Sequence, residues 1–244
     1  MNKPVKKSSQ PLHKMIKDDL LNKLESGFYP ENTIIPTELE LADIYQVSRP
    51  TVRQAISVLV ADGYLERKKR KGTMVKRKKI DQAFTQVIQS FESEMLQKGL
   101  IPKTTVLSLK KDSANFEVAE SLALVEGAPI FKLMRLRYAL EEPVVLVTTY
   151  VPAHLFKGFL TVDFEKNSLY QIMSDMGYPV SSIKRKLDVL KADETTSDLL
   201  SIEENDPIFY FHSTGFTKEK IPVEYSISKY RGDLNSFEFE ITTE

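Results

Sequence analysis

The chain has 244 residues, and its 34 basic residues balance 34 acidic ones, so its overall charge indicates nothing about nucleic-acid binding. It has no cysteine, which excludes disulfides and thiolate metal sites and suits the reducing cytoplasm where we expect it. The three histidines are scattered, no apolar run is as long as a membrane span, and the first ten residues lack the apolar core of a signal peptide, so we expect no metal site and no membrane partner.

A helix is predicted to run from Leu12 to Ser26 and to end at Gly27. Two more helices follow at close spacing. Thr37, with Glu40 three residues later, forms a capping box and predicts a helix start. After a two-residue turn, Ser48 is predicted to cap a second helix that ends near Gly63. The apolar side of this last helix repeats at helical spacing: Val52, Ala55, Ile56, Leu59 and Val60.

Two helices joined by so short a turn are typical of a helix-turn-helix, whose second helix lies in the DNA major groove. The face opposite the apolar side carries residue types that reach base edges or phosphates. The candidate DNA-binding residues of this helix are Ser48, Arg49, Thr51, Arg53 and Gln54.

A basic hairpin is predicted directly after the second helix. Short strands at 64–68 and 73–75 flank a tip of three cations and Gly72, which is typical of a wing that contacts phosphates or the minor groove. Its candidate DNA-binding residues are Arg70, Lys71, Gly72 and Thr73. Each part alone fits an ordinary helical pair with a solvated hairpin, but their order favours a DNA-binding winged helix over residues 11–76.

Charge is divided unevenly along the chain. Residues 1–79 hold 17 basic and 9 acidic residues, a balance of +8, so residues 80–244 hold 17 and 25, a balance of −8. The asymmetry indicates a first part that binds a polyanion and a second part that does not. Between them, residues 77–98 are predicted to form a basic linker and a coupling helix from Asp81 to Lys98, with Phe84, Val87, Ile88, Phe91 and Met95 on one side.

The second domain, expected over residues 99–242, contains a weak internal repeat. Residues 122–144 resemble residues 200–223, and each copy runs from a short helix through Pro-Ile-Phe into a hairpin. Strands are predicted at 104–109, 130–140, 144–151, 184–190, 208–217, 223–231 and 237–241, and helices at 116–122, 169–176 and 195–200. Hairpins joined by short helices indicate an α+β domain with an antiparallel sheet, in which two facing copies would leave a cleft.

Arg135 and Arg137 stand two residues apart on an otherwise apolar strand, so their side chains project from the same face. Two guanidinium groups there repel each other unless an anion lies between them, and arginine binds phosphate or carboxylate in a forked geometry. The segment Asn167–Tyr170 opens a predicted helix whose free N–H groups also favour an anion. The alternative is that both arginines pair with carboxylates of their own domain.

These segments together resemble a known family. Residues 36–73 resemble the winged helix of GntR-type bacterial transcription regulators. The remainder is similar to the UTRA-type effector domain of the HutC subfamily, through Arg135–Arg137, Asn167–Tyr170 and Pro222–Asp233. The resemblance implies a homodimer on a palindromic double-stranded operator, a small anionic effector, no cofactor, and a second domain related in fold to chorismate lyase without catalysis.

The branch of this subfamily that responds to phosphorylated amino sugars is the most similar one. Carried over by position, the residues implied to hold the phosphate are Ser90, Arg135, Arg137, Ser168 and Tyr170. Glu224 and Tyr230 are implied to meet the sugar, and Phe91 to line the pocket. The chain departs from the branch at Val147, where a glutamate is expected, and at Glu92, where a threonine is expected.

A third departure is Leu39, which stands where many relatives carry a DNA-contacting arginine. The resemblance leads us to expect a repressor released from DNA by a phosphorylated sugar or amino sugar. Two alternatives stay open: a constitutive DNA-binding protein whose second domain only dimerises, and a chorismate-lyase-like enzyme fused to a DNA-binding domain.

Overall fold

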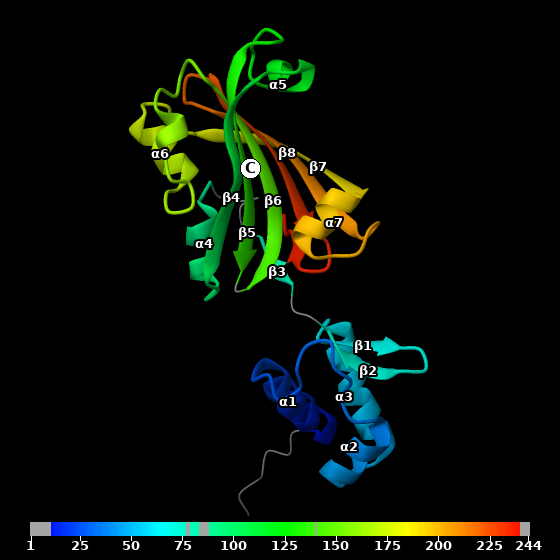
Figure 1. The fold of residues 1–244 in the computed structure, drawn as a ribbon. Coiled ribbons are helices and arrows are strands. Elements are labelled where there is room, and N and C mark those ends of the chain that lie inside the picture. Colours follow the sequence, from blue (N-terminus) through cyan, green and yellow to red (C-terminus); the bar gives the residue numbers. More distant parts are fainter. Residues whose placement is uncertain (1–10, 77–78, 83–87, 140, 240–244) are drawn as a thin grey trace, which may run out of the picture. The chain divides into compact units, whose positions relative to one another are not determined.

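The computed structural model describes residues 11–76, 79–82, 88–139 and 141–239. It divides into two compact units, Met1–Lys78 and Lys79–Glu244 (Figure 1). No described helix is both long and apolar enough to cross a membrane.

The first unit is a winged helix. Its elements are α1 (Leu12–Glu25), α2 (Glu38–Tyr45), α3 (Arg49–Ala61), β1 (Leu65–Lys68) and β2 (Gly72–Val75). The strands β1 and β2 form an antiparallel hairpin. All three helices and the hairpin bury apolar side chains in one core, whose members include Leu20, Leu41, Val52, Ile56, Leu59, Leu65 and Val75. The apolar spacing predicted for the third helix is therefore confirmed.

The helix starts also follow the predicted chemistry. The backbone N–H of Thr37 donates to Glu40 Oε2 at 2.7 Å and the N–H of Glu40 donates to Thr37 Oγ1 at 3.3 Å, which confirms the capping box. Ser48 is the N-cap of α3, but its hydroxyl contacts Thr51 Oγ1 at 2.8 Å rather than the backbone. Gly63 ends the helical segment with a φ of +81°.

The second unit is built on a six-stranded antiparallel sheet with the order β4-β5-β6-β9-β8-β7 (Figure 1). The strands are β4 (Pro102–Ser113), β5 (Pro129–Ala139), β6 (Glu142–Pro152), β7 (Ser182–Lys191), β8 (Pro207–Phe216) and β9 (Pro222–Arg231). The helices are α4 (Phe91–Gln97), α5 (Phe116–Ser121), α6 (Leu169–Asp175) and α7 (Glu194–Leu200), with a 3₁₀ turn, η2, at Phe159–Thr161. The α+β fold class is confirmed.

The internal repeat explains the strand order. One copy runs β4, α5, β5, β6 and the other runs β7, α7, β8, β9, and the two copies join at the antiparallel pair of β6 and β9. The order on one side of this pair is therefore the reverse of the order on the other, as a twofold axis would require.

The two faces of the sheet carry different helices. Leu122 after α5 and Leu200 of α7 pack on the face that carries Tyr225 and Leu136. On the other face, α4 packs against Val145, Val147 and Tyr230, and α6 packs against Leu133 and Val223. The second face carries the side chains of Arg135 and Arg137, because alternate residues of a strand point to the same side.

The coupling helix predicted from Asp81 to Lys98 is wrong in its first part. Ile80–Asp81 forms β3, which pairs in parallel with β10 (Asn235–Ser236), and α4 begins only at Phe91. The N-cap is Ser90, whose Oγ accepts from the N–H of Ser93 at 3.1 Å. Phe84 and Val87 lie outside the described residues. A partner strand 155 residues later in sequence, which periodicity does not reveal, holds the start of this segment extended.

The strand predicted at 237–241 is also displaced. The extended pairing is at Asn235–Ser236, and residues 237–239 form no strand, while residues 240–241 lie outside the described part of the chain. Phe237 instead packs its ring against Phe209, Phe211 and Tyr230, with centroids 4.8–5.3 Å apart. Aromatic packing thus explains the apolar residue that suggested a strand.

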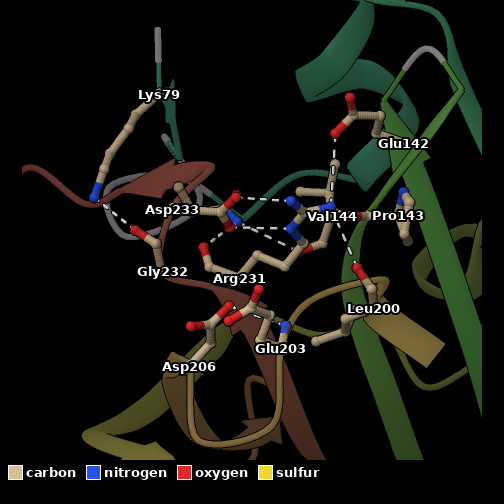
Figure 2. A network of polar contacts seen from close by, with 11 residues as sticks. Lys79, Glu142, Pro143, Val144, Leu200, Glu203, Asp206, Arg231, Gly232 and Asp233 are labelled. Atoms are coloured by element: carbon tan, nitrogen blue, oxygen red, sulfur yellow. Dashed lines mark hydrogen bonds and ion pairs between the residues drawn. The ribbon is translucent and has the colours of Figure 1, made fainter. Parts of the chain in front are cut away.

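A buried arginine ties the end of β9 to its surroundings (Figure 2). Arg231 is only 6% exposed and forms a forked pair with Asp233, at 3.0 Å from Nε and 2.7 Å from Nη2. Its Nη1 also donates to the Leu200 carbonyl at 3.2 Å and lies 3.6 Å from Glu142. Lys79 Nζ donates to the Gly232 carbonyl at 2.6 Å, so the first residues of this unit bind the same corner.

Gly232→Ala is expected to destabilise the second unit. A Cβ at Gly232 would lie 2.4 Å from the carbonyl oxygen of Pro207, which accepts the Gly232 N–H at 3.0 Å. Because both contacts are backbone, the corner must shift, at a cost of about 1–3 kcal/mol in the free energy of unfolding. Urea unfolding measures this loss, with the exposed Lys166→Ala as a control within ~0.5 kcal/mol of the original. Equal stability of Gly232→Ala and the control would contradict the packing described.

Candidate functional sites

The amino-terminal half of α3 presents its polar side chains outward. Arg49 and Arg53 have side chains 57% and 51% exposed, Gln54 is exposed, and Thr51 is half-buried behind Ser48. The opposite side of the helix is buried in the core, so only this face is available to a groove of DNA.

An open groove separates this helix from the wing. It is lined by Ile34, Ile35, Thr37, Glu38, Leu39, Arg49, Arg53, Arg67, Lys68, Arg70, Lys71, Gly72 and Thr73. The groove brings six of the nine predicted DNA-binding residues together. The other three lie outside it: Ser48 is the N-cap of α3, and Thr51 and Gln54 lie in the helix.

Two features of this surface were missed by sequence reasoning. Arg67 of β1 lines the groove, although it was assigned only to the strand. Glu38 lies among the arginines, with its carboxylate within 3.6 Å of Arg49, Arg53 and Arg67. Strand alternation does not reveal Arg67, because positions 65 and 67 share one face of β1 and Leu65 points to the core.

Lys71→Ala is expected to weaken binding to all duplexes alike. Lys71 lies at the exposed tip of the hairpin beside Gly72, whose φ of +118° makes the turn, and a flexible ammonium there suits phosphate rather than a base edge. The slope of log K against log salt should fall in magnitude by about 1. Fluorescence anisotropy on random duplexes at several salt concentrations measures the slope of log K against log salt. An unchanged slope in Lys71→Ala would remove Lys71 from the interface.

The second unit contains a cavity that opens to solvent and is lined mainly by polar side chains. Its wall includes all eight predicted effector-binding residues: Ser90, Phe91, Arg135, Arg137, Ser168, Tyr170, Glu224 and Tyr230. They come from the start of α4, the start of α6, and strands β5 and β9. Residues separated by 140 positions in sequence thus line one space.

The two arginines of β5 are the most unusual groups in this cavity. Arg135 is 3% exposed, and burial together with the charge of Arg137 lowers its pKa to about 9, so it stays charged at neutral pH. Burial also lowers the pKa of Arg137, whose guanidinium lies 5.1 Å from the centre of the Phe91 ring. Among the described residues neither forms an ion pair and the Nε atoms of both have no hydrogen-bond partner, while Arg135 Nη2 donates to Thr149 Oγ1 at 3.4 Å. Within the described ranges, carboxylates of the same domain therefore act on the two arginines only through the charges of Glu224 and Glu92, without a direct ion pair.

Three further polar groups of the wall have raised pKa values. Burial raises the pKa of the Glu224 carboxyl, and the charge of Arg135 partly offsets this effect. Burial and the neighbouring Glu224 raise the pKa of Tyr170, and burial raises that of Tyr230, so both phenols remain donors at neutral pH.

Sequence reasoning missed several residues of the cavity, which are Gln89, Glu94, Arg185, Ser213, Ser226 and Ser228. The alternation of Glu224, Ser226, Ser228 and Tyr230 along β9 was readable, because such positions share one face. The positions of Ser213 and Arg185 were not, since they depend on the register in which β8 and β7 add to β9. The two departures, Val147 and Glu92, also lie on the wall.

Within the described ranges, the structure holds no group of three or more histidine, aspartate or glutamate side chains that could bind a metal ion. The two sites thus consist of an exposed basic groove on a winged helix and a buried basic cavity on an α+β sheet. Together they define a DNA-binding transcription regulator with a separate small-molecule domain.

Comparison with known proteins identifies the family. The family described as bacterial regulatory proteins, gntR family, matches residues 12–75, and the UTRA domain matches residues 97–235. The chain is 30% identical over 224 residues to the HTH-type transcriptional regulator GmuR of Bacillus subtilis (strain 168), covering 91% of this chain and 94% of GmuR. It is 29% identical over 233 residues to the HTH-type transcriptional repressor NagR of the same strain, covering 95% of each chain.

A solved structure shares the architecture. The crystal structure of PhnF from Mycobacterium smegmatis has a TM-score of 0.76 and 26% identity, covering 94% of this chain and all of that one. The chain therefore belongs to the GntR family of bacterial transcription regulators and carries a UTRA effector domain. These relatives are transcription regulators, so the comparisons support a regulator rather than an enzyme.

Proposed function

We propose that this regulator is a cytoplasmic homodimeric repressor, released from a palindromic operator when a phosphorylated sugar or amino sugar occupies the cavity of its UTRA domain. In this proposal residues 11–76 bind DNA, residues 77–98 couple the two parts, and residues 99–242 bind the effector and dimerise. The observation that carries it is the pair Arg135 and Arg137, two buried guanidinium groups with unsatisfied Nε atoms in one cavity.

A phosphate monoester fits this half of the cavity. Its three oxygens accept several hydrogen bonds and its two negative charges compensate two guanidinium groups, which otherwise repel each other in a medium of low dielectric constant. The half-buried Ser168 and the protonated Tyr170 supply two more donors on the same wall.

The other half fits a polyhydroxylated body. Glu224 accepts hydrogen bonds from hydroxyl or amino groups, and Ser226, Ser228 and Tyr230 follow it at alternate positions of β9. Val147 places an apolar side chain between Arg135 and Ser228 in the sheet, where the amino-sugar branch is expected to carry a glutamate. We infer that the sugar differs from the one bound by that branch near this position.

The start of α4 offers a route from the cavity to the segment that leads to the DNA-binding domain. Ser90, Phe91 and Glu94 line the cavity, and Glu94 lies 3.6 Å from Lys98 one turn later. Lys98 donates to the carbonyl of Asp81 in β3. An effector that shifts α4 would therefore move this segment and change the separation of two winged helices, which must lie about 34–36 Å apart on successive turns of DNA. A coupling of roughly 1–3 kcal/mol would change operator affinity by about 5–150-fold.

Thermal unfolding of the purified protein with a panel of sugar phosphates and the matching unphosphorylated sugars tests the effector class. A ligand at about 100 times its dissociation constant should add about 2.7 kcal/mol to the stability of the unit that it binds. We expect a shift with a phosphorylated sugar and none with its unphosphorylated form. A shift with neither would contradict the phosphate assignment and favour a constitutive DNA-binding protein whose second domain only dimerises.

A further inference from the structure

Glu38 lies where α2, α3 and the wing meet, and its carboxylate is shared by three arginines. Arg53 contacts Glu38 Oε2 through Nη2 at 2.9 Å and Nε at 3.0 Å. Arg49 Nε reaches the same oxygen at 3.2 Å, and Arg67 Nη2 lies 3.6 Å from Oε1. The Glu38 side chain is 18% exposed, whereas those of the arginines are 50–57% exposed.

A carboxylate at this place is costly for binding DNA, because it repels phosphates. The first turn of a helix favours an acidic residue, but Glu40 already completes the capping box there. The dipole of α2 also does not explain why cations from two other elements meet at Glu38. The hydrogen bond from Arg53 holds the pKa of Glu38 below its usual range, so the carboxylate is charged at neutral pH.

The contacts leave the arginines able to bind DNA. Arg49 uses only its Nε on Glu38, so its two Nη groups remain on the exposed side of α3. A fork of this kind is the group that reads the O6 and N7 atoms of guanine. Arg67 Nη2 also donates to Ser57 Oγ at 3.1 Å, which fixes the wing strand to α3. The cluster carries three positive charges and one negative charge, so its balance still attracts DNA.

We propose that Glu38 is a positioning residue for DNA specificity, which holds Arg49 and Arg53 in the orientation that reads bases and joins Arg67 of the wing to them as a further DNA-contacting residue. A long arginine side chain without such an anchor contacts phosphates of any sequence equally well. Glu38 therefore lowers non-specific binding by its charge and raises specific binding by the order that it imposes. The inference rests on the operator binding proposed above.

Glu38→Gln tests this role, because the amide keeps the size of the side chain and removes the charge. Two DNA probes are compared. The specific probe is a duplex that the full-length original protein enriches from a random pool, and the non-specific probe is a random duplex of equal length. In Glu38→Gln we expect tighter binding of the random duplex, weaker binding of the enriched one, and a fall of about 5–150-fold in their affinity ratio. Glu38→Asp keeps the charge but shortens the side chain. In this variant the ratio of affinities for the enriched and the random duplex should fall, and the random duplex should not bind more tightly.

Glu66→Gln is the matched control. Glu66 is a carboxylate of the wing strand β1, and it pairs with Lys68 at 2.9 Å rather than with the arginine cluster. Its removal should tighten binding of both duplexes alike and leave the ratio unchanged. Arg67→Gln should lower the magnitude of the salt slope by about 1, and Arg67→Lys should restore it.

The outcomes separate this inference from the proposed function. If the original protein enriches no sequence, operator binding and the role of Glu38 are both overturned. If it enriches one and Glu38→Gln keeps the original ratio, only the role of Glu38 is overturned. If the ratio of affinities for the enriched and the random duplex falls equally in Glu66→Gln, the role of Glu38 is also overturned. An unchanged salt slope in Arg67→Gln would remove Arg67 from the interface. Thermal unfolding of each variant ensures that only folded proteins are compared.

Discussion

Arg135→Ala is expected to abolish the response to the effector while leaving DNA binding intact. Arg135 is buried in the cavity wall, carries a positive charge and has an unsatisfied Nε. Loss of one partner of a buried, hydrogen-bonded charge pair typically costs about 2–5 kcal/mol, which raises the dissociation constant roughly 30- to 4,000-fold. Isothermal titration with the sugar phosphate that stabilises the original protein measures this loss.

Lys132→Ala is the matched control for this variant. Lys132 lies on the same strand but points to the opposite face, where its Nζ lies 5.7 Å from the centre of the Tyr150 ring. The substitution Lys132→Ala removes one positive charge from β5 and leaves the cavity wall unchanged. The effector should therefore bind with the affinity that it has for the original protein. Equal losses in Arg135→Ala and Lys132→Ala would show a general effect of charge and contradict a phosphate site at Arg135.

Arg53→Ala is expected to relax DNA specificity at one base pair. Arg53 lies in the exposed half of α3, and a forked contact to a guanine contributes about 1–3 kcal/mol of discrimination against another base. Binding to the enriched duplex should therefore weaken about 5–150-fold, with a much smaller change on random DNA. The phosphate-contacting Lys71 is the comparison, since Lys71→Ala should weaken both duplexes equally. Equal losses on both duplexes for Arg53→Ala would make it a backbone contact.

The winged helix could be predicted from sequence because its signals are local. The capping box at Thr37 and Glu40, the cap at Ser48 and the apolar spacing of α3 each lie within one or two helical turns. The hairpin is also local, with strands separated by a short basic turn. What stayed hidden was the contact of Glu38 with Arg67, because it depends on how β1 packs beside α2.

The effector domain shows the limits of sequence patterns more clearly. Alternation on β5 predicted that Arg135 and Arg137 share a face, and the structure places them together in the cavity wall. Arg185 lines the same cavity from β7, which is four strands away from β5 in the sheet. No spacing within the chain reveals such a position, because sheet order is a long-range property.

The helix predicted from Asp81 to Lys98 illustrates a different cause of error. Its apolar residues follow helical spacing, yet Ile80 and Asp81 adopt a strand because the backbone of Leu234–Ser236 pairs with them. Gln82 then donates to Asn235 at 2.7 Å, and both side chains are buried. Pairing with a distant segment thus prevails over local helix propensity.

The measurement that tests the central claim most directly is a titration of the protein–operator complex with the stabilising sugar phosphate, followed by fluorescence anisotropy of the labelled enriched duplex. The account predicts that the ligand releases the duplex, with affinity falling about 5–150-fold, and that the complex of Arg135→Ala stays bound at the same ligand concentration. Ligand that binds the protein without changing operator affinity, or that releases the Arg135→Ala complex equally well, would contradict the account.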